Sequence, residues 1–69
     1  MKQNLFPAGD GKEVPPELGH VIVYFQQKGK SERDALDFFN YFESRKWMNQ
    51  INRKVANWKK SAWEWIWYR

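Results

Sequence analysis

Aromatic side chains are what most limits how this chain can fold. Five Trp, five Phe and three Tyr occur among the 69 residues, and there is no cysteine. Without cysteine, neither disulfides nor a zinc–thiolate site can hold the domain together. A chain this short buries only about 60% of its unfolded surface, and each aromatic side chain can bury roughly 150–250 Å². The sequence therefore predicts one small domain with an aromatic core, and more rings than that core can hold.

Residues 15–28 carry the first helical pattern. Pro15-Pro16 opens this segment and Gly29 ends it, because proline is tolerated in a first turn and glycine suits a left-handed stop. The run 21–25 is also compatible with a strand, but the two end signals favour a helix. The apolar side chains that share one face of this helix are Leu18, Val21, Ile22 and Phe25.

Residues 32–46 and 54–68 are predicted to form two further helices. Ser31 and Asp34 have the spacing of a capping box, with Asp in place of the usual Glu, which predicts a weak cap. Trp47 is expected to close the second helix. The apolar stripe of the second helix consists of Ala35, Phe38, Phe39 and Phe42, and that of the third consists of Val55, Trp58, Ala62 and Trp65.

The three segments combine into an all-α prediction. Only two residues separate the first two helices, so these are expected to form a tight helical hairpin, with the third helix packed across it. The connection 48–54 is polar and basic, and Ile51 is expected to pin it to the core. Residues 1–14 have no helical or alternating period and are interpreted as a flexible N-terminal leader. The predicted three-helix domain, a helical hairpin plus a C-terminal helix, therefore spans residues 15–69.

Positive charge is concentrated after the first helix. The whole chain has a net charge of +4, but residues 28–69 carry ten Lys or Arg against five Asp or Glu, a balance of +5. Between Ser44 and Trp63 there are six basic residues and no acidic one. Such a local excess favours a polyanionic partner, of which nucleic acid is the usual example. The alternative is a solvated basic face that has no partner.

Two indoles of the third helix lie off its apolar stripe. Lys59, Trp63 and Trp67 share a face that three small helices are not expected to cover. Cations replace the counterions of nucleic acid, and exposed rings provide stacking surfaces for unpaired bases, so single-stranded DNA is the favoured ligand. The alternative is that Trp63 and Trp67 pack against the leader or a partner subunit. The predicted nucleic-acid-binding residues are Arg45, Lys46, Arg53, Lys54, Lys59, Lys60, Trp63 and Trp67.

No arrangement of residues in the sequence indicates catalysis. His20 is the sole histidine, and no serine has a spacing that suggests a nucleophilic triad with it, so a surface or capping role is expected. Asp34 and Asp37 lie three residues apart among arginines, which is typical of surface ion pairs rather than of a metal site. No glycine-rich phosphate loop is present. The protein is therefore predicted not to be an enzyme and to need no metal or cofactor.

The sequence has no membrane or export signal. No apolar run approaches the roughly 20 residues of a membrane span. The N-terminal residues 1–7 lack the long apolar core of a signal peptide. A cytoplasmic location is expected, which the absence of cysteine fits.

The stretch from Ala35 to Trp65 resembles a known family. The residues Ala35-x-x-Phe38-x-x-Tyr41-Phe42-Glu43-Ser44-x-x-Trp47, a basic spacer, and Trp58-Lys59-x-x-Ala62-x-x-Trp65 are similar to a small helical module of phages and mobile elements. That module lies near the C-termini of replication proteins, including replisome organisers, DnaD- or DnaT-like helicase loaders and primase-associated proteins. The resemblance covers residues 14–69. It implies core positions at Ala35, Phe38, Phe42, Trp47, Trp58 and Trp65, and basic positions at Arg53, Lys54 and Lys59.

The chain departs from the family pattern around its inter-helix turn. The family usually has glycine before the first tryptophan, where this chain has Lys46, and an acidic residue before the second, where it has Asn57. The spacer also lacks the family's glycine. We therefore expect an inter-helix turn of different shape.

Two functional hypotheses follow. The first is a non-enzymatic DNA-associated accessory protein, in the replication or transfer of a phage or mobile element. The second is an interaction module that docks a helicase, primase or second copy of itself through the C-terminal tryptophans. The sequence leaves the oligomeric state open.

Overall fold

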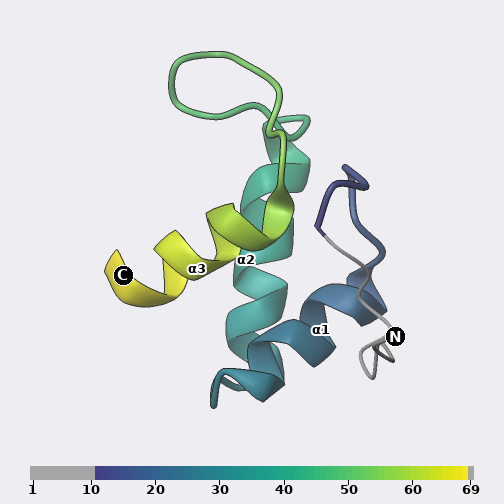
Figure 1. Cartoon of the computed structure of the whole chain (residues 1–69), viewed down its shortest axis with the longest axis vertical. Helices are drawn as coiled ribbons and strands as arrows, with labels where there is room; N and C mark the ends of the chain where they lie inside the picture. Colours follow the sequence, from purple (N-terminus) through teal and green to yellow (C-terminus); the bar gives the residue numbers. More distant parts are fainter. Residues whose placement is uncertain (1–10, 69) are drawn as a thin grey trace, which may run out of the picture.

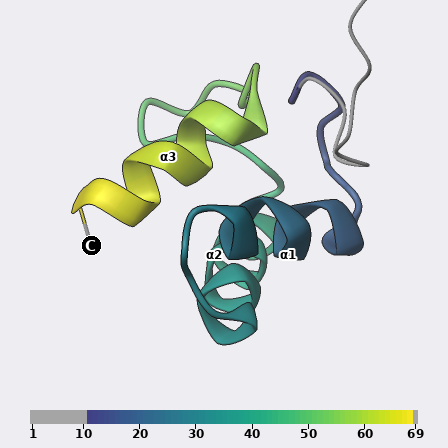
Figure 2. The same ribbon diagram turned by 60° about the horizontal axis from the view of Figure 1, so that its bottom comes forward.

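The computed structural model of the chain describes residues 11–68, which form three helices and the segments between them (Figure 1). The helices are α1 (Leu18–Gln27), α2 (Glu32–Ser44) and α3 (Trp58–Tyr68). α1 turns sharply into α2, and α3 lies across them (Figures 1 and 2). The described residues form no strand, only an isolated bridge between Met48 and Lys54. The predicted all-α, three-helix fold is confirmed.

Phe38 of α2 occupies the centre of the core. Its ring lies 5.3 Å from that of Phe25 on α1 and 5.5 Å from that of Trp65 on α3, measured between centroids. Trp47 and Phe42 pack on it at 5.9 Å and 5.1 Å. All three helices are therefore joined through one buried ring. The predicted apolar stripes supply most of the buried apolar residues, which are Val21, Phe25, Ala35, Phe38, Trp47, Val55, Trp58 and Ala62.

Residues before α1 belong to the folded domain. The carbonyl of Gly11 accepts a hydrogen bond of 2.8 Å from the Trp58 backbone N–H, and Val14 packs against the core. Gly11 has a φ of +91°, and a Cβ there would collide with the Asn57 side chain, so both backbone conformation and space favour glycine. Gly11 and Val14, which the prediction assigned to the leader, thus contact the rest of the domain. Residues 1–10 of the predicted leader lie outside the described residues.

α1 begins three residues later than predicted. Pro15 and Pro16 precede the helix, and Glu17 is its N-cap in an extended conformation, with φ −77° and ψ 140°. The residue before a proline is disfavoured in the helical region, which keeps Pro15 out of the first turn. Pro16 is buried.

The two ends of α2 are fixed by local hydrogen bonds. At its start, Ser31 Oγ accepts from the Asp34 N–H at 3.2 Å and the Ser31 N–H donates to Asp34 Oδ2 at 3.3 Å, so the capping box is complete. At its end, the Lys46 N–H donates to the Glu43 carbonyl and the Trp47 N–H to the Phe42 carbonyl, at 3.1 and 2.8 Å. This pattern is a Schellman motif. It ends α2 at Ser44, before the predicted residue 46.

The same motif ends α1, but with a different residue at the left-handed position. Gly29 has a φ of +80° at the end of α1, whereas Lys46 has a φ of +57° at the end of α2. Trp47 follows in the same left-handed region with a φ of +58°. A side chain at such a φ costs roughly 1–2 kcal/mol, which glycine avoids. The end of α2 is therefore strained where the end of α1 is not.

The segment between α2 and α3 closes on itself and shortens α3. The Val55 N–H donates to the Trp47 carbonyl at 2.8 Å, and Asn49 Oδ1 accepts from the backbone N–H groups of Ile51 and Arg53, both at 3.0 Å. The prediction that Ile51 pins this loop to the core is wrong, because its side chain is 71% exposed. The Asn49 side chain closes the loop instead.

α3 begins at Trp58 rather than at the predicted residue 54. Asn57 Oδ1 accepts from the N–H groups of Lys59 and Lys60, at 2.9 and 3.2 Å, as an N-cap residue does. The Ser61 N–H donates to the Asn57 carbonyl, and Gly11 binds the Trp58 N–H. The N–H groups of Trp58, Lys59 and Lys60, which have no partner within the helix, are therefore satisfied, and the bond from Ser61 is the first within α3.

Replacing Lys46 with glycine should stabilise the protein. Relief of about 1–2 kcal/mol of left-handed strain exceeds the roughly 0.5–1 kcal/mol of extra chain entropy that glycine loses on folding. We expect Lys46→Gly to raise the free energy of unfolding by roughly 0.5–1 kcal/mol in urea denaturation. Lys46→Ala, which removes the charge but keeps the strain, is the control and should give no such gain. Gly29→Ala should destabilise the protein although the space around Gly29 is open. Equal free energies of unfolding for Lys46→Gly and Lys46→Ala would contradict the backbone strain inferred at position 46.

The two most buried indoles should respond differently to replacement by phenylalanine. Trp47 Nε1 donates a hydrogen bond of 2.7 Å to Glu43 Oε1, whereas the fully buried Trp58 Nε1 has no hydrogen-bond partner among the described residues. Leaving a buried donor unpaired costs about 1–3 kcal/mol. Trp58→Phe removes that cost, so we expect it to destabilise the protein by about 1 kcal/mol less than Trp47→Phe. Urea unfolding of both variants measures the difference, and equal losses would contradict it.

Candidate nucleic-acid interface

Trp63 and Trp67 form an exposed pair on α3. Their ring centroids are 5.4 Å apart with the planes at 63°, and their side chains are 44% and 63% exposed. Trp58 and Ala62, which belong to the apolar stripe of the same helix, are fully buried. The prediction that two indoles lie outside the core is confirmed. Residues 11–68 leave both side chains exposed. The alternative, in which the pair packs against the leader or a partner subunit, stays a prediction.

A lysine from α1 joins the tryptophan pair. Lys28 is the C-cap residue of α1, and its Nζ lies 5.0 Å from the ring centroid of Trp63 and 5.3 Å from that of Tyr24. Lys28 was not predicted as a site residue. Periodicity places residues on one helix but does not pair α1 with α3, so the sequence held no signal for this contact.

Tyr24 links α1 to the start of α3. Its hydroxyl donates to the Lys59 carbonyl at 3.4 Å, its ring meets that of Trp58 at 5.5 Å, and Lys59 Nζ lies 5.7 Å from its centroid. Lys59 therefore lies on the same side of the molecule as Lys28. We call the set Tyr24, Lys28, Lys59, Trp63 and Trp67 the aromatic–lysine patch.

The other predicted cations lie elsewhere. Arg45 is the C-cap of α2, with its guanidinium 4.5 Å from the Tyr41 ring centroid, and Lys46 is in the following turn. Arg53 and Lys54 are exposed on the loop between α2 and α3, which Figure 1 shows at the top of the molecule. Within residues 11–68, no hydrogen bond, ion pair or ring contact joins these four cations to the tryptophan pair. Lys60 is exposed in the first turn of α3.

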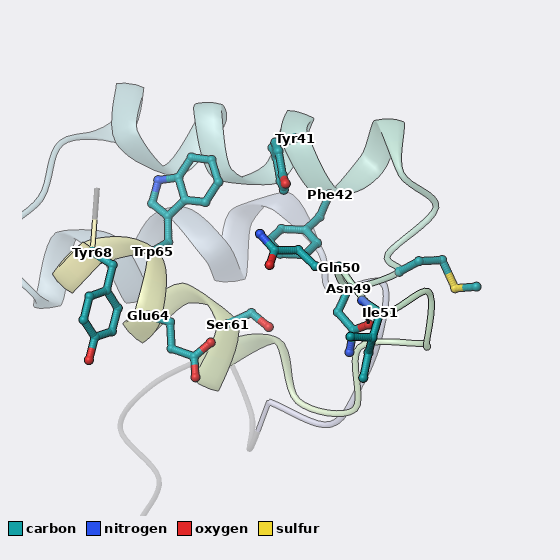
Figure 3. Close-up of a pocket in the computed structure, with 10 residues that line it drawn as sticks. Tyr41, Phe42, Asn49, Gln50, Ile51, Ser61, Glu64, Trp65 and Tyr68 are labelled. Carbon is teal, nitrogen blue, oxygen red and sulfur yellow. Dashed lines mark hydrogen bonds between the residues drawn. The ribbon is translucent and has the colours of Figure 1, made fainter.

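A groove on another side of α3 was not predicted. It has a volume of about 450 Å³ and lies between α2, the 48–54 loop and α3 (Figure 3). Phe42 and Trp65 are partly buried in it, and Glu64 is the one charged side chain in its lining. Its remaining lining residues are Tyr41, Met48, Asn49, Gln50, Ile51, Ser61 and Tyr68. The groove depends on how three segments meet, which helical periodicity does not reveal.

The ionisable residues considered for chemistry make surface contacts. His20 Nδ1 lies 3.2 Å from Glu13 Oε1, and its Nε2 lies 3.7 Å from Glu17 Oε1. Arg33 pairs with Asp37 at 3.8 Å, as predicted, while Asp34 serves in the capping box. The described part of the chain holds no group of three or more His, Cys, Asp or Glu residues that could bind a metal ion. No helix within residues 11–68 is long and apolar enough to cross a membrane.

Comparison of the chain with protein-family models, curated proteins and solved structures finds no match in any of the three. The resemblance of residues 14–69 to a module of phage replication proteins stays a prediction. The site is therefore interpreted from its own geometry.

Alkaline pH should destabilise the fold partly through Tyr24. Burial raises the pKa of the Tyr24 phenol above its ordinary value of 10.0. The unfolded chain then loses this proton at lower pH than the folded one, so ionisation favours unfolding. The contribution of Tyr24 is fully present below pH 10 and is lost as the pH rises through the folded-state pKa.

The measurement is a series of urea unfolding curves from neutral pH to above pH 10 for the wild type and Tyr24→Phe. Titration of the lysines affects both proteins alike. We expect the free energy of unfolding to fall less steeply with pH in the variant. Parallel pH profiles would contradict a raised pKa at Tyr24.

Proposed function

We propose that this protein is a non-enzymatic accessory protein that binds single-stranded nucleic acid through the aromatic–lysine patch. The observation that carries the proposal is the exposed Trp63–Trp67 pair with the Lys28 ammonium 5.0 Å from one of its rings. Surfaces for unpaired strands combine rings for the bases with cations for the backbone. The proposed setting, replication or transfer of a phage or mobile element, comes from the family resemblance alone.

The tryptophan pair suits stacking because its rings are accessible to a ligand. Trp67 is the more exposed of the two, at 63%, and its ring meets Trp63 edge to face. A base stacked on such a ring contributes about 1–3 kcal/mol and is accepted whatever its identity. The patch therefore favours a ligand with unpaired bases over a regular duplex, whose bases are already stacked.

Lys28, Lys59 and Lys60 supply the charge in this proposal. Lys28 is held above Trp63 and Tyr24 by cation–π contacts, which contribute roughly 0.5–1 kcal/mol each at exposed sites. A strand lying along α3 would pass Lys59 and Lys60 in the first turn, where the positive end of the helix dipole also favours phosphate. Backbone contacts of this kind make affinity depend on salt.

The proposal predicts which charge reversal weakens binding. Lys28 and Arg45 are each a helix C-cap residue with its cation over a tyrosine ring, but only Lys28 also lies over Trp63. Lys28→Glu should therefore lower the affinity for a short oligothymidylate more than Arg45→Glu, although the change in net charge is identical. Trp67→Ala should weaken binding by about 5- to 150-fold, the equivalent of one stacked base.

Tryptophan fluorescence, titrated with the single strand and with a short duplex at low and moderate salt, measures these affinities. The expected result is quenching by the single strand, with the logarithm of the affinity falling by about 0.7 per phosphate neutralised for each tenfold rise in salt. Equal losses in the two charge variants would assign binding to net charge alone. No response to either ligand at low salt would overturn the proposal.

The second candidate is docking of a protein, such as a helicase or primase, on the same indoles. The observation that favours it is the run of exposed aromatic residues on α3, where Tyr68 is 83% exposed beside Trp67. Exposed aromatic residues with charged neighbours are typical of interaction hot spots. A protein that ignores both nucleic acids at low salt would support this candidate.

A further inference from the structure

The groove between α2, the 48–54 loop and α3 has an apolar projection at each end. Figure 3 shows Ile51 at the loop end and Tyr68 at the end formed by the last turn of α3. These side chains are 71% and 83% exposed. Between them lie the partly buried rings of Phe42 and Trp65. A partner can cover this surface if it presents protruding apolar side chains of its own to the groove.

Charged side chains also lie near the two ends of the groove. Glu64 lies one helical turn before Tyr68 and lines the groove, whereas Arg53 and Lys54 follow Ile51 on the loop. The groove lining therefore contains one carboxylate, that of Glu64, and the cations Arg53 and Lys54 lie on the loop beyond Ile51, outside the lining. Neither Glu64 nor Arg53 is neutralised by an ion pair within residues 11–68.

We propose that a second copy of this chain covers the groove, in antiparallel orientation about a two-fold axis. A two-fold interface pairs each contact with its symmetry-related partner, so residue i meets j and j meets i. In this arrangement the loop of one copy lies against the last turn of α3 of the other. Arg53 of each copy then faces Glu64 of the other, and Ile51 of each meets the Tyr68 end.

The chemistry of the groove favours a second copy over nucleic acid. Its lining contains no Lys or Arg, and its one charged side chain, Glu64, would repel phosphate. The dimer leaves the tryptophan pair accessible, because Trp63 and Trp67 are not in the groove lining. This inference therefore does not rest on the proposed nucleic-acid function.

The size of the groove predicts a weak dimer. A stable interface buries about 800 Å² on each partner, roughly a sixth of the 5070 Å² surface of this chain. A contact confined to three short segments is expected at the low end of that range. The monomer–dimer equilibrium should therefore depend on concentration over the range that sedimentation equilibrium covers.

The test uses two single charge reversals and their mixture. Arg53→Glu brings two carboxylates together at both symmetry-related contacts, and Glu64→Arg brings two guanidinium groups together at both. Each variant alone should dimerise at least about ten-fold more weakly than the wild type, because like charges face each other twice. An equimolar mixture should form a heterodimer whose two contacts differ. One contact pairs the Glu introduced at position 53 of one copy with the Arg introduced at position 64 of the other, and these side chains attract each other. The second contact pairs the original Arg53 with the original Glu64. The affinity should therefore return to near the wild-type value.

Two controls separate this result from a change in fold or net charge. Both positions are exposed, so far-UV circular dichroism and the urea midpoint should match the wild type. Lys28→Glu changes the net charge as Arg53→Glu does but lies outside the groove, and should dimerise normally.

A wild type that stays monomeric at every concentration would overturn the proposal. A dimer that tolerates both reversals would also overturn it, by assigning association to another surface such as the tryptophan pair. A mixture that fails to restore association would overturn the antiparallel pairing.

Discussion

Trp47 connects the end of α2 to the core through its indole and to the residues before α3 through its backbone carbonyl. Its ring stacks on Phe42 at 5.3 Å and meets Phe38 at 5.9 Å, and its N–H is bound by Glu43. Its backbone carbonyl accepts from the Val55 N–H, which brings the chain back to the start of α3. Both Trp47 and Lys46 hold left-handed backbone conformations. Burial of a large ring at the centre of the core offsets that local cost.

The core divides the five tryptophans by depth, and the division creates the two candidate surfaces. Trp47 and Trp58 are buried, and Trp65 is half-buried between the core and the groove. Trp63 and Trp67 remain outside. Because three short helices cannot enclose all of these rings, α3 presents indoles to solvent on one side and a groove on another. Both proposals therefore use aromatic surface that the core leaves uncovered.

Helical periodicity was enough to predict which residues of α3 face the core and which do not. Trp58 and Ala62 are buried and Trp63 and Trp67 are exposed because their angular positions follow from sequence alone. The start of α3 could not be predicted in the same way. Asn57 caps this helix, Asn49 closes the loop before it, and Gly11 binds the Trp58 N–H, and the last two contacts depend on the folded arrangement of separate segments.

The candidate site was also predicted only in part, because periodicity within one helix does not reveal contacts between segments. The exposed indoles and Lys59 share one helix, so spacing identified them. Lys28 reaches Trp63 from a different helix, and the groove forms where three segments meet. The predicted grouping of Arg45 and Arg53 with the tryptophans rested on their nearness in sequence, and no described contact joins them. Contacts between segments depend on packing angles that a one-dimensional pattern does not contain.

The hydrogen bond from Trp58 to Gly11 makes the last helix depend on the first described residue of the chain. The turn between α1 and α2 is local and needs only neighbouring residues, whereas this bond joins segments far apart in the sequence. Closing so long a loop has an entropic cost that must be met before the contact contributes any stability. We therefore expect the α1–α2 unit to order first and α3 to dock last. In that case the helix that carries both candidate surfaces is also the one we expect to be released first.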